Sequence, residues 1–229
     1  MVIIKKESGN AINYVMAYIV LIVTLTVTML LINQQEILIA KQEIENGTQI
    51  CESFVLANSD FVLGADETDR LLARRQIITA YEYNQENKNL TYDEAQQVSS
   101  ISQKYSNQIQ KRFKLDALGY PTNTVLSEVG DSKLLIEDFV IYEAVYDEND
   151  TIIGFIEYVT VFNSNNNYIS CLPKTYLPAD TEIAGNTLYG STIYSALSFE
   201  INIFNQIKKK IIVPVVVDIV PQKSYQSRP

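Results

Sequence analysis

The feature that most constrains this chain is a long run without charge near its N-terminus. No Asp, Glu, Lys or Arg lies between Glu7 and Glu36, and the apolar part of this interval extends from Ala11 to Asn33. A helix needs about 20 apolar residues to cross the hydrocarbon core of a bilayer, where it satisfies its own backbone hydrogen bonds. The run therefore predicts one membrane-spanning helix, and the residues after Asn33 must be what that helix holds at the surface.

The run is typical of a retained anchor rather than of a cleaved secretory signal. A signal peptide has an apolar region of about 7–15 residues followed by small residues, whereas this run is longer and ends MLLI before NQQ. Lys5 and Lys6 precede it, and no cation follows until Lys41. Because positive charge stays on the cytoplasmic side, we expect a cytoplasmic leader at residues 1–10 and a single-pass protein with its C-terminal part outside the cell.

The helical pattern continues past the lipid span without a break. Gln34 to Asp60 contains no proline, and apolar or small residues recur there at alternating steps of three and four. Such spacing predicts a helix with one packed face, made of Ile37, Ala40, Ile44, Gly47, Cys51 and Phe54. We expect one helix from Ala11 to about Asn58, about 70 Å long, whose second half packs on its own domain or on a neighbouring copy.

Downstream patterns predict two further helices and then a mainly antiparallel sheet, so the fold class is α+β. One helix is expected at about 69–83, with Asp66 or Thr68 as its cap, and another from the capping box Thr91–Glu94 to about Leu115. Runs rich in Ile, Val, Tyr and Phe predict a hairpin of 134–146 and 151–162, a short strand at 168–172, a loop at 173–190, and strands at 193–203 and 211–220. Pro214 places the last strand at an edge or a bulge, and 205–210 is expected to turn.

These boundaries divide the chain into a leader, a long helix and a head. The ranges are 1–10 for the leader, 11–60 for the transmembrane and extended helix, 61–120 for a helical subdomain, 130–221 for the β domain and 222–229 for a tail. About 195 residues follow the span, which is enough for one compact domain or two small ones.

Composition excludes several functions. The net charge of −9 argues against a nucleic-acid partner, since phosphate binding needs clustered Lys and Arg. The chain has no histidine, which removes the Ser-His-Asp and Cys-His catalytic arrangements. We identify no catalytic, cofactor-binding or metal-binding residues and expect no cofactor. The run Lys208-Lys209-Lys210 could contact anionic headgroups or a polymer, but a solvated turn is favoured.

The two cysteines leave two alternatives open. Cys51 and Cys171 both fall on the side expected to be extracellular. An oxidising exterior would allow one disulfide between the helical half and the β half. Two buried free thiols are an equally good interpretation.

The order of these segments resembles the type IV pilin superfamily. A basic leader with Lys5, Lys6 and Gly9 is followed by the apolar run, an amphipathic continuation and a β-rich domain. More narrowly, the chain is similar to minor pilin-like proteins of tight-adherence (TadE-like) pili and related archaeal proteins. The resemblance implies processing between Gly9 and Asn10. It also implies oligomers with other pilin-like subunits, although Tyr14 stands where pilins carry Glu, which fits an uncleaved anchor or a minor component.

Two functions of different class follow from these observations. The first is a pilin-like structural or accessory subunit of an extracellular filament, acting through packing of its long helix. The second is a membrane-anchored binding module whose β domain recognises an extracellular ligand or a cell-wall polymer. An anchored hydrolase is least favoured, because no nucleophile setting is recognisable.

Overall fold

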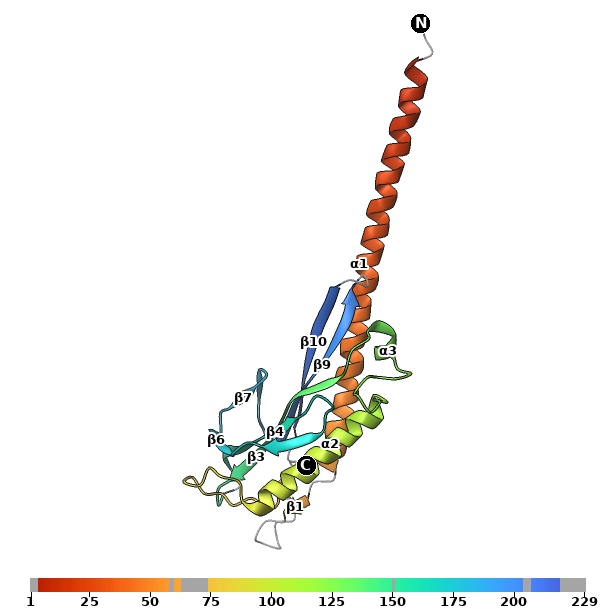
Figure 1. Cartoon of the computed structure of the whole chain (residues 1–229). Helices are drawn as coiled ribbons and strands as arrows, with labels where there is room; N and C mark the ends of the chain where they lie inside the picture. Colours follow the sequence, from red (N-terminus) through yellow and green to blue (C-terminus); the bar gives the residue numbers. More distant parts are fainter. Residues whose placement is uncertain (1–3, 58–59, 63–73, 150, 204–206, 219–229) are drawn as a thin grey trace, which may run out of the picture.

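A single long helix and a compact head make up the computed structural model, which describes residues 4–57, 60–62, 74–149, 151–203 and 207–218. Helix α1 (Ile4–Ala57) projects from the head for about half its length and packs against it for the rest (Figure 1). The expectation of one uninterrupted helix is confirmed. The helix begins at Ile4, so Gly9 and Asn10 lie within it rather than in a separate leader.

The head is built on one antiparallel sheet in the order β10-β9-β3-β4-β5, with β6 pairing the free side of β4 beside β5. Its long strands are β3 (Leu135–Tyr146), β4 (Ile152–Phe162), β9 (Thr192–Ile203) and β10 (Ile207–Asp218). Short strands β5 (Tyr168–Cys171) and β6 (Thr175–Pro178) complete it. Pro214 lies in β10, an edge strand of the sheet. Among the described residues no further strand pairs with the outer side of β10, so the missing N–H of proline costs no hydrogen bond on that side.

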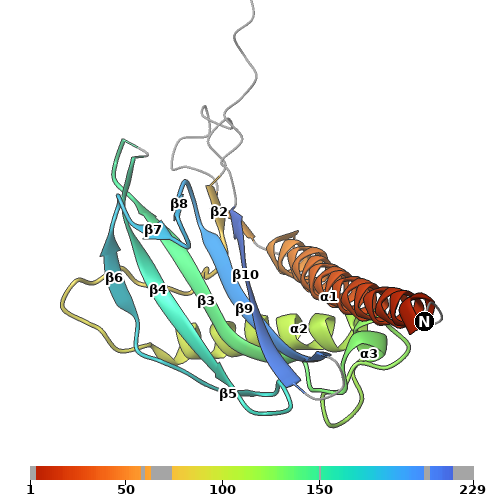
Figure 2. The same ribbon diagram turned by 90° about the horizontal axis from the view of Figure 1, so that it is seen from above.

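Two helices cover one face of this sheet. The second half of α1 and helix α2 (Tyr92–Arg112) lie side by side on it, with the short helix α3 (Val125–Val129) beside α1 (Figure 2). Alternate strand residues face them, so Phe139 and Ile141 of β3 and Leu197 and Phe199 of β9 are almost fully buried. The main core therefore lies between the helices and the sheet.

The opposite face carries a second, smaller core. Val140, Tyr142 and Ala144 point to it from β3 and pack with Phe155 and Leu188. The segment that covers them contains β6 and the hairpin of β7 (Glu182–Ile183) and β8 (Asn186–Thr187). The expectation of a plain loop at 173–190 was therefore wrong, because these residues pair with β4 and with each other.

Helix α2 confirms the sequence prediction in detail. Thr91 Oγ1 accepts the N–H of Glu94, and Glu94 Oε2 accepts the N–H of Thr91, as the capping box requires. The apolar positions at helical spacing, Val98, Ile101, Tyr105 and Ile109, are all buried against the sheet and α1.

Two other predictions were wrong. The helix expected at 69–83 is absent from its described part, since β2 (Arg74–Gln76) pairs with β1 (Asp60–Val62) and residues 77–83 are not helical. Its proposed caps, Asp66 and Thr68, and the tail at 222–229 lie outside the described residues. The expected turn at 205–210 was wrong for its second part, because Ile207 to Lys210 belong to β10 and pair with Ile203 to Glu200, while residues 205 and 206 lie outside the described residues.

Candidate functional site

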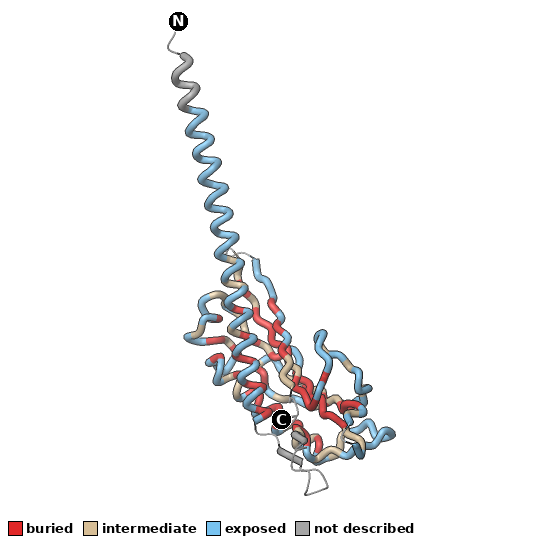
Figure 3. The backbone as a smooth tube through the Cα atoms, turned by 180° about the vertical axis from the view of Figure 1, so that it is seen from behind, coloured by how far each residue is buried: buried red, intermediate tan, exposed pale blue. Residues whose placement is uncertain are grey.

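The first half of α1 is a bare apolar surface. Every residue from Ala11 to Ile32 is exposed (Figure 3), and the most apolar 18-residue window has a mean hydropathy of 2.7 with none of it buried. The threonines on this surface leave no unpaired hydroxyl groups. The hydroxyls of Thr24, Thr26 and Thr28 each donate a 2.8 Å hydrogen bond to the carbonyl oxygen four residues earlier. By length and composition this segment can cross a bilayer as a single-pass anchor.

The second half of α1 packs its predicted apolar face against the head of the same chain. Ala40 and Ile44 are fully buried, Cys51 is 2% exposed and Ile37 packs at the edge of the same core. Gly47 is buried because the ring of Phe113 lies on it: a Cβ there would be 2.8 Å from Cε1 and closer still to Cζ. The close contact at Gly47 is thus made by the side chain of Phe113, the residue that follows α2.

Phe54 does not belong to this face. Its side chain is 46% exposed, while Val55 and Leu56 take the buried positions at the end of α1. The reason is the helical period: over 17 residues, steps of three and four drift away from 3.6 per turn. Phe54 lies on the flank that also carries Ile39 and Ile50, which are 46% and 56% exposed.

A buried polar chain joins α1 to α2 and β9. The hydroxyl of Tyr105 donates to Ser195 Oγ over 2.8 Å, and Ser195 Oγ donates to Glu52 Oε1 over 2.6 Å. Glu52 is fully buried, and neither its Oε2 nor the hydroxyl of Thr48, one turn earlier, has a hydrogen-bond partner among the described residues. An ionised carboxylate would be costly in this position.

The electrostatics of this cluster follow from burial. Burial raises the pKa of Glu52 to about 8, against a smaller lowering by the hydroxyl of Ser195. Burial likewise raises the pKa of the Cys51 thiol to about 12, although Arg112 lowers it and Glu52 raises it further. The pKa of Tyr105 is raised as well, by burial first and then by Glu52. The cluster is therefore neutral when the protein is folded at acidic to neutral pH.

Of the two alternatives left open for the cysteines, the structure has the free thiols. Cys51 and Cys171 are both free thiols, the first buried on α1 and the second half-buried on β5. Helix α2 packs against both of these elements (Figure 2). Since the thiolate is the reactive form of cysteine, the raised pKa of Cys51 makes it an inert core residue.

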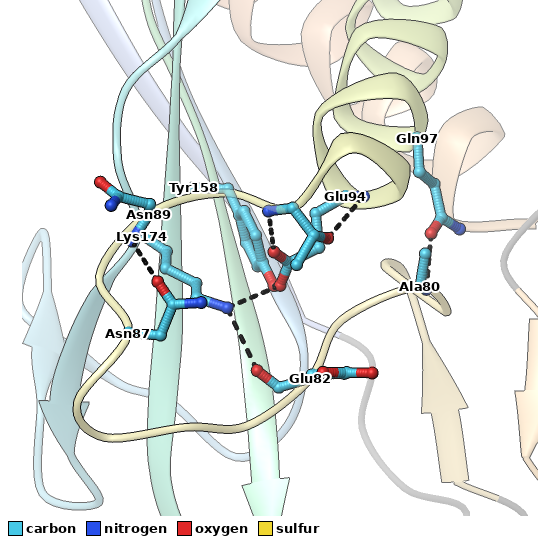
Figure 4. Close-up of polar contacts among 9 residues, drawn as sticks. Ala80, Glu82, Asn87, Asn89, Glu94, Gln97, Tyr158 and Lys174 are labelled. Atoms are coloured by element: carbon cyan, nitrogen blue, oxygen red, sulfur yellow. Dashed lines mark hydrogen bonds and ion pairs between the residues drawn. The ribbon is translucent and has the colours of Figure 1, made fainter.

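A second polar cluster fixes the segment before α2 (Figure 4). Lys174 Nζ lies 2.9 Å from Glu94 Oε1 and donates to the carbonyl of Glu82 over 3.1 Å, while the hydroxyl of Tyr158 donates to the same carboxylate over 3.3 Å. Burial raises the pKa of Glu94, but the N–H of Thr91 and the ammonium of Lys174 outweigh it and hold that pKa below its ordinary value. Glu94 thus serves as helix cap and as the anion of a buried ion pair.

This cluster underlies a small, shallow hollow of about 40 Å³ at the end of the head away from the bare helix. Its walls include the side chains of Tyr83 and Tyr176, whose ring centroids are 5.4 Å apart, together with Asn84, Gln85 and Asn87. Paired aromatic rings beside amide groups suit a polar ligand with apolar faces. It is the place where the binding-module hypothesis would be tested.

A third buried acid holds the chain after β2. Glu143 of β3 is fully buried, and its carboxylate accepts the N–H groups of Ile77 and Ile78 at 2.9 Å and the hydroxyl of Ser191 at 2.7 Å. Burial raises its pKa to about 7, against lowering by these three donors. The sequence offered no signal for this role, because Glu143 is one of many acids in the chain.

Comparisons of the chain with protein-family models, with curated proteins and with solved structures find no match.

Proposed function

We propose that the protein is a membrane-anchored, pilin-like structural or accessory subunit of an extracellular filament or surface assembly. The observation that carries the proposal is the two-part use of α1: a bare apolar half continues, without a break, into a half that is packed on the head. A subunit of this shape can leave the bilayer and exchange lipid for neighbouring helices, while its head coats the resulting bundle.

A surface for those neighbours follows from the helical period. Five apolar residues, which we call the outer stripe, fall within about 60° of one another on a helix of 3.6 residues per turn: Leu25, Ile32, Ile39, Ile50 and Phe54. Each is between 46% and 56% exposed. The stripe is apolar in the bare half of α1; in the half packed on the head, Glu36 and Glu43 fall in the same sector, and Glu43 lies 3.5 Å from Arg112 of α2. The stripe supports assembly through helix packing.

The packed face of α1 is unsuitable for testing assembly. A charge at Ile44 or Cys51 would unfold the head itself, since both side chains are buried in its core. The test belongs on the outer stripe, where Ile50→Glu adds a charge to an exposed position of α1. Ile169→Glu on β5 is the matched control, because that isoleucine is also 56% exposed but lies far from the stripe.

We expect Ile50→Glu to abolish recovery of the protein in the sheared surface-filament fraction, while Ile169→Glu leaves recovery unchanged. Both variants should retain the wild-type unfolding midpoint in detergent, which shows that the head is folded. Filaments containing Ile50→Glu at normal abundance would contradict the proposal. The intact mass of the membrane-extracted protein reports separately whether residues 1–9 are removed after Gly9.

The hollow lined by Tyr83 and Tyr176 favours the second candidate, a membrane-anchored module that binds a surface ligand or a cell-wall polymer. Pull-down of the detergent-solubilised full chain on purified cell wall tests it. We expect Tyr83→Ala to reduce retention at least tenfold under this hypothesis, and Tyr92→Ala, at an 80% exposed position on α2, to have no effect. Equal retention of both variants would remove this candidate.

A further inference from the structure

The end of the β9–β10 pair lies where the bare half of α1 begins. Figure 1 shows both strands running beside α1 toward that point. Glu36 of α1 and Asn202 of β9 line the same surface hollow, and Ile37 and Ile203 pack at the edge of the same core. Glu36 is the first charge after the apolar run. The strand end is therefore level with the place where α1 would leave the bilayer.

The side chains at this strand end suit a membrane interface. Ile207 is 60% exposed, and Lys208 and Lys209 are exposed without an ion pair among the described residues. Lys210 differs, since its Nζ lies 2.6 Å from Glu137 Oε1. Because strand residues alternate in direction, Lys208 and Lys209 present cations on opposite faces of the strand, and Lys209 shares the face of Ile207.

Protection of a sheet edge explains only part of this arrangement. Lysines on an edge strand discourage pairing with another chain, and β10 is an edge strand. That role does not account for an exposed isoleucine at the end of the strand beside two lysines. Acidic residues are close to this end of the head: Glu36, Glu128 of α3 and Asp131 line one hollow together with Asn202, the cross-strand partner of Lys208.

We propose that the membrane-proximal end of β10 docks on the anionic headgroups of the bilayer that holds α1. Ile207 enters the interface, and Lys208 and Lys209 contact lipid phosphates. The inference rests on the proposed membrane anchor, and it adds a second, charge-dependent contact to it.

The lack of tryptophan in the chain makes a direct test available. Three single-tryptophan variants of the full chain are reconstituted in vesicles whose lipids carry bromine in their acyl chains: Ile207→Trp at the proposed contact, Ile153→Trp at the opposite end of the sheet, and Met16→Trp in the span. Bromine quenches only indoles that reach the lipid. Vesicles with and without anionic phosphatidylglycerol are compared at low and high salt.

We expect strong quenching of Trp at 16 in all vesicles, quenching of Trp at 207 only with anionic lipid at low salt, and none at 153. A lysine near an anionic surface contributes about 1 kcal/mol, so Lys208→Gln and Lys209→Gln should each lower the ratio of docked to undocked heads about fivefold. Lys88→Gln, in the loop at the far end, should change nothing.

The outcomes separate the two proposals. Quenching at 16 but not at 207 overturns the docking and leaves the anchor intact. No quenching at 16 overturns the anchor and the docking with it. If quenching at position 207 does not depend on lipid charge and is unchanged by both lysine replacements, recognition of headgroups is overturned.

Discussion

The buried carboxyl of Glu52 gives the sharpest test of how α1 is held on the head. Its pKa is raised from 4.5 to about 8 in the folded protein, chiefly by burial. The folded state therefore keeps a proton that the unfolded chain has already lost. The contribution of Glu52 to stability is greatest below about pH 4.5 and falls as pH rises to about 8, at about 1.4 kcal/mol per pH unit. The full interval amounts to about 5 kcal/mol, comparable to the whole stability of many domains.

Glu143 adds a second contribution of the same sign over a narrower range. Burial raises its pKa to about 7, so both acids release protons on unfolding between about pH 4.5 and 7. The wild-type slope should be about 3 kcal/mol per pH unit there and about half of that from pH 7 to 8. Glu94 and Glu137, whose pKa values are lowered, act in the opposite sense but only as pH falls below about 4.5.

The perturbation is Glu52→Gln, which keeps an acceptor for the hydroxyl of Ser195 and removes the titrating proton. At pH 5 the variant should be no more stable than wild type, because its amide N–H₂ meets the same unpartnered surroundings as Oε2. Between pH 5 and 8 it should lose about 4 kcal/mol less than wild type. The two stability curves therefore cross.

Urea titrations of the full chain in non-ionic detergent, followed by tyrosine near-ultraviolet circular dichroism at pH 5, 6, 7 and 8, measure this directly. With a urea dependence of about 2 kcal/mol per M, the midpoints should diverge by about 2 M across the series. Glu45→Gln, on an exposed position of α1, is the control and should follow wild type. Parallel curves for Glu52→Gln and wild type would refute an uncharged buried carboxyl at this position.

Three further substitutions test the packing around α1 and α2 by the same urea titration. Gly47→Ala forces a methyl into the ring of Phe113 and should cost about 1–3 kcal/mol despite the better helix propensity of alanine; an unchanged midpoint would mean that the ring moves freely. Thr48→Val removes a buried hydroxyl without a partner and should stabilise by about 1 kcal/mol; destabilisation would show that the hydroxyl is satisfied. Lys174→Met leaves the carboxylate of Glu94 buried without its cation and should cost about 3–5 kcal/mol at pH 7, but less at pH 4; equal losses at the two pH values would contradict the ion pair.

Much of the fold could be predicted because its signals are local. The charge-free run sets α1, the capping box at Thr91 sets the start of α2, and the turn at 147–149 sets the β3–β4 hairpin. Alternation from Ile193 onward sets β9, whose inner face is buried. In each case neighbouring residues in the sequence decide the structure, so one chain suffices to recognise it.

The wrong predictions concern segments whose structure depends on contacts with residues far away in the sequence. Ile77 and Ile78 fit a helical pattern, but their N–H groups are taken by Glu143, 65 or more residues away. That contact holds a bend and irregular backbone in place of the predicted helix. Glu52 fell outside the predicted packed face because a glutamate at that spacing is ordinarily solvated, yet Ser195 meets it from 143 residues along the chain. Tertiary hydrogen bonds of this kind leave no periodic signal.

The way α1 is built also limits how the head can move. No proline occurs between Ile4 and Ala57. The glycine in the half of α1 that packs on the head, Gly47, is covered by the ring of Phe113. Sharp helix kinks arise at such residues or at inserted side chains, so this half offers no hinge. The packed face begins at Ile37, directly after the first charge that follows the apolar run. With no spacer between the two halves, rotation or withdrawal of the apolar half must be transmitted to the head as a rigid movement. A subunit drawn out of a bilayer would carry its head along in a fixed orientation, and that orientation would set which faces of neighbouring heads meet.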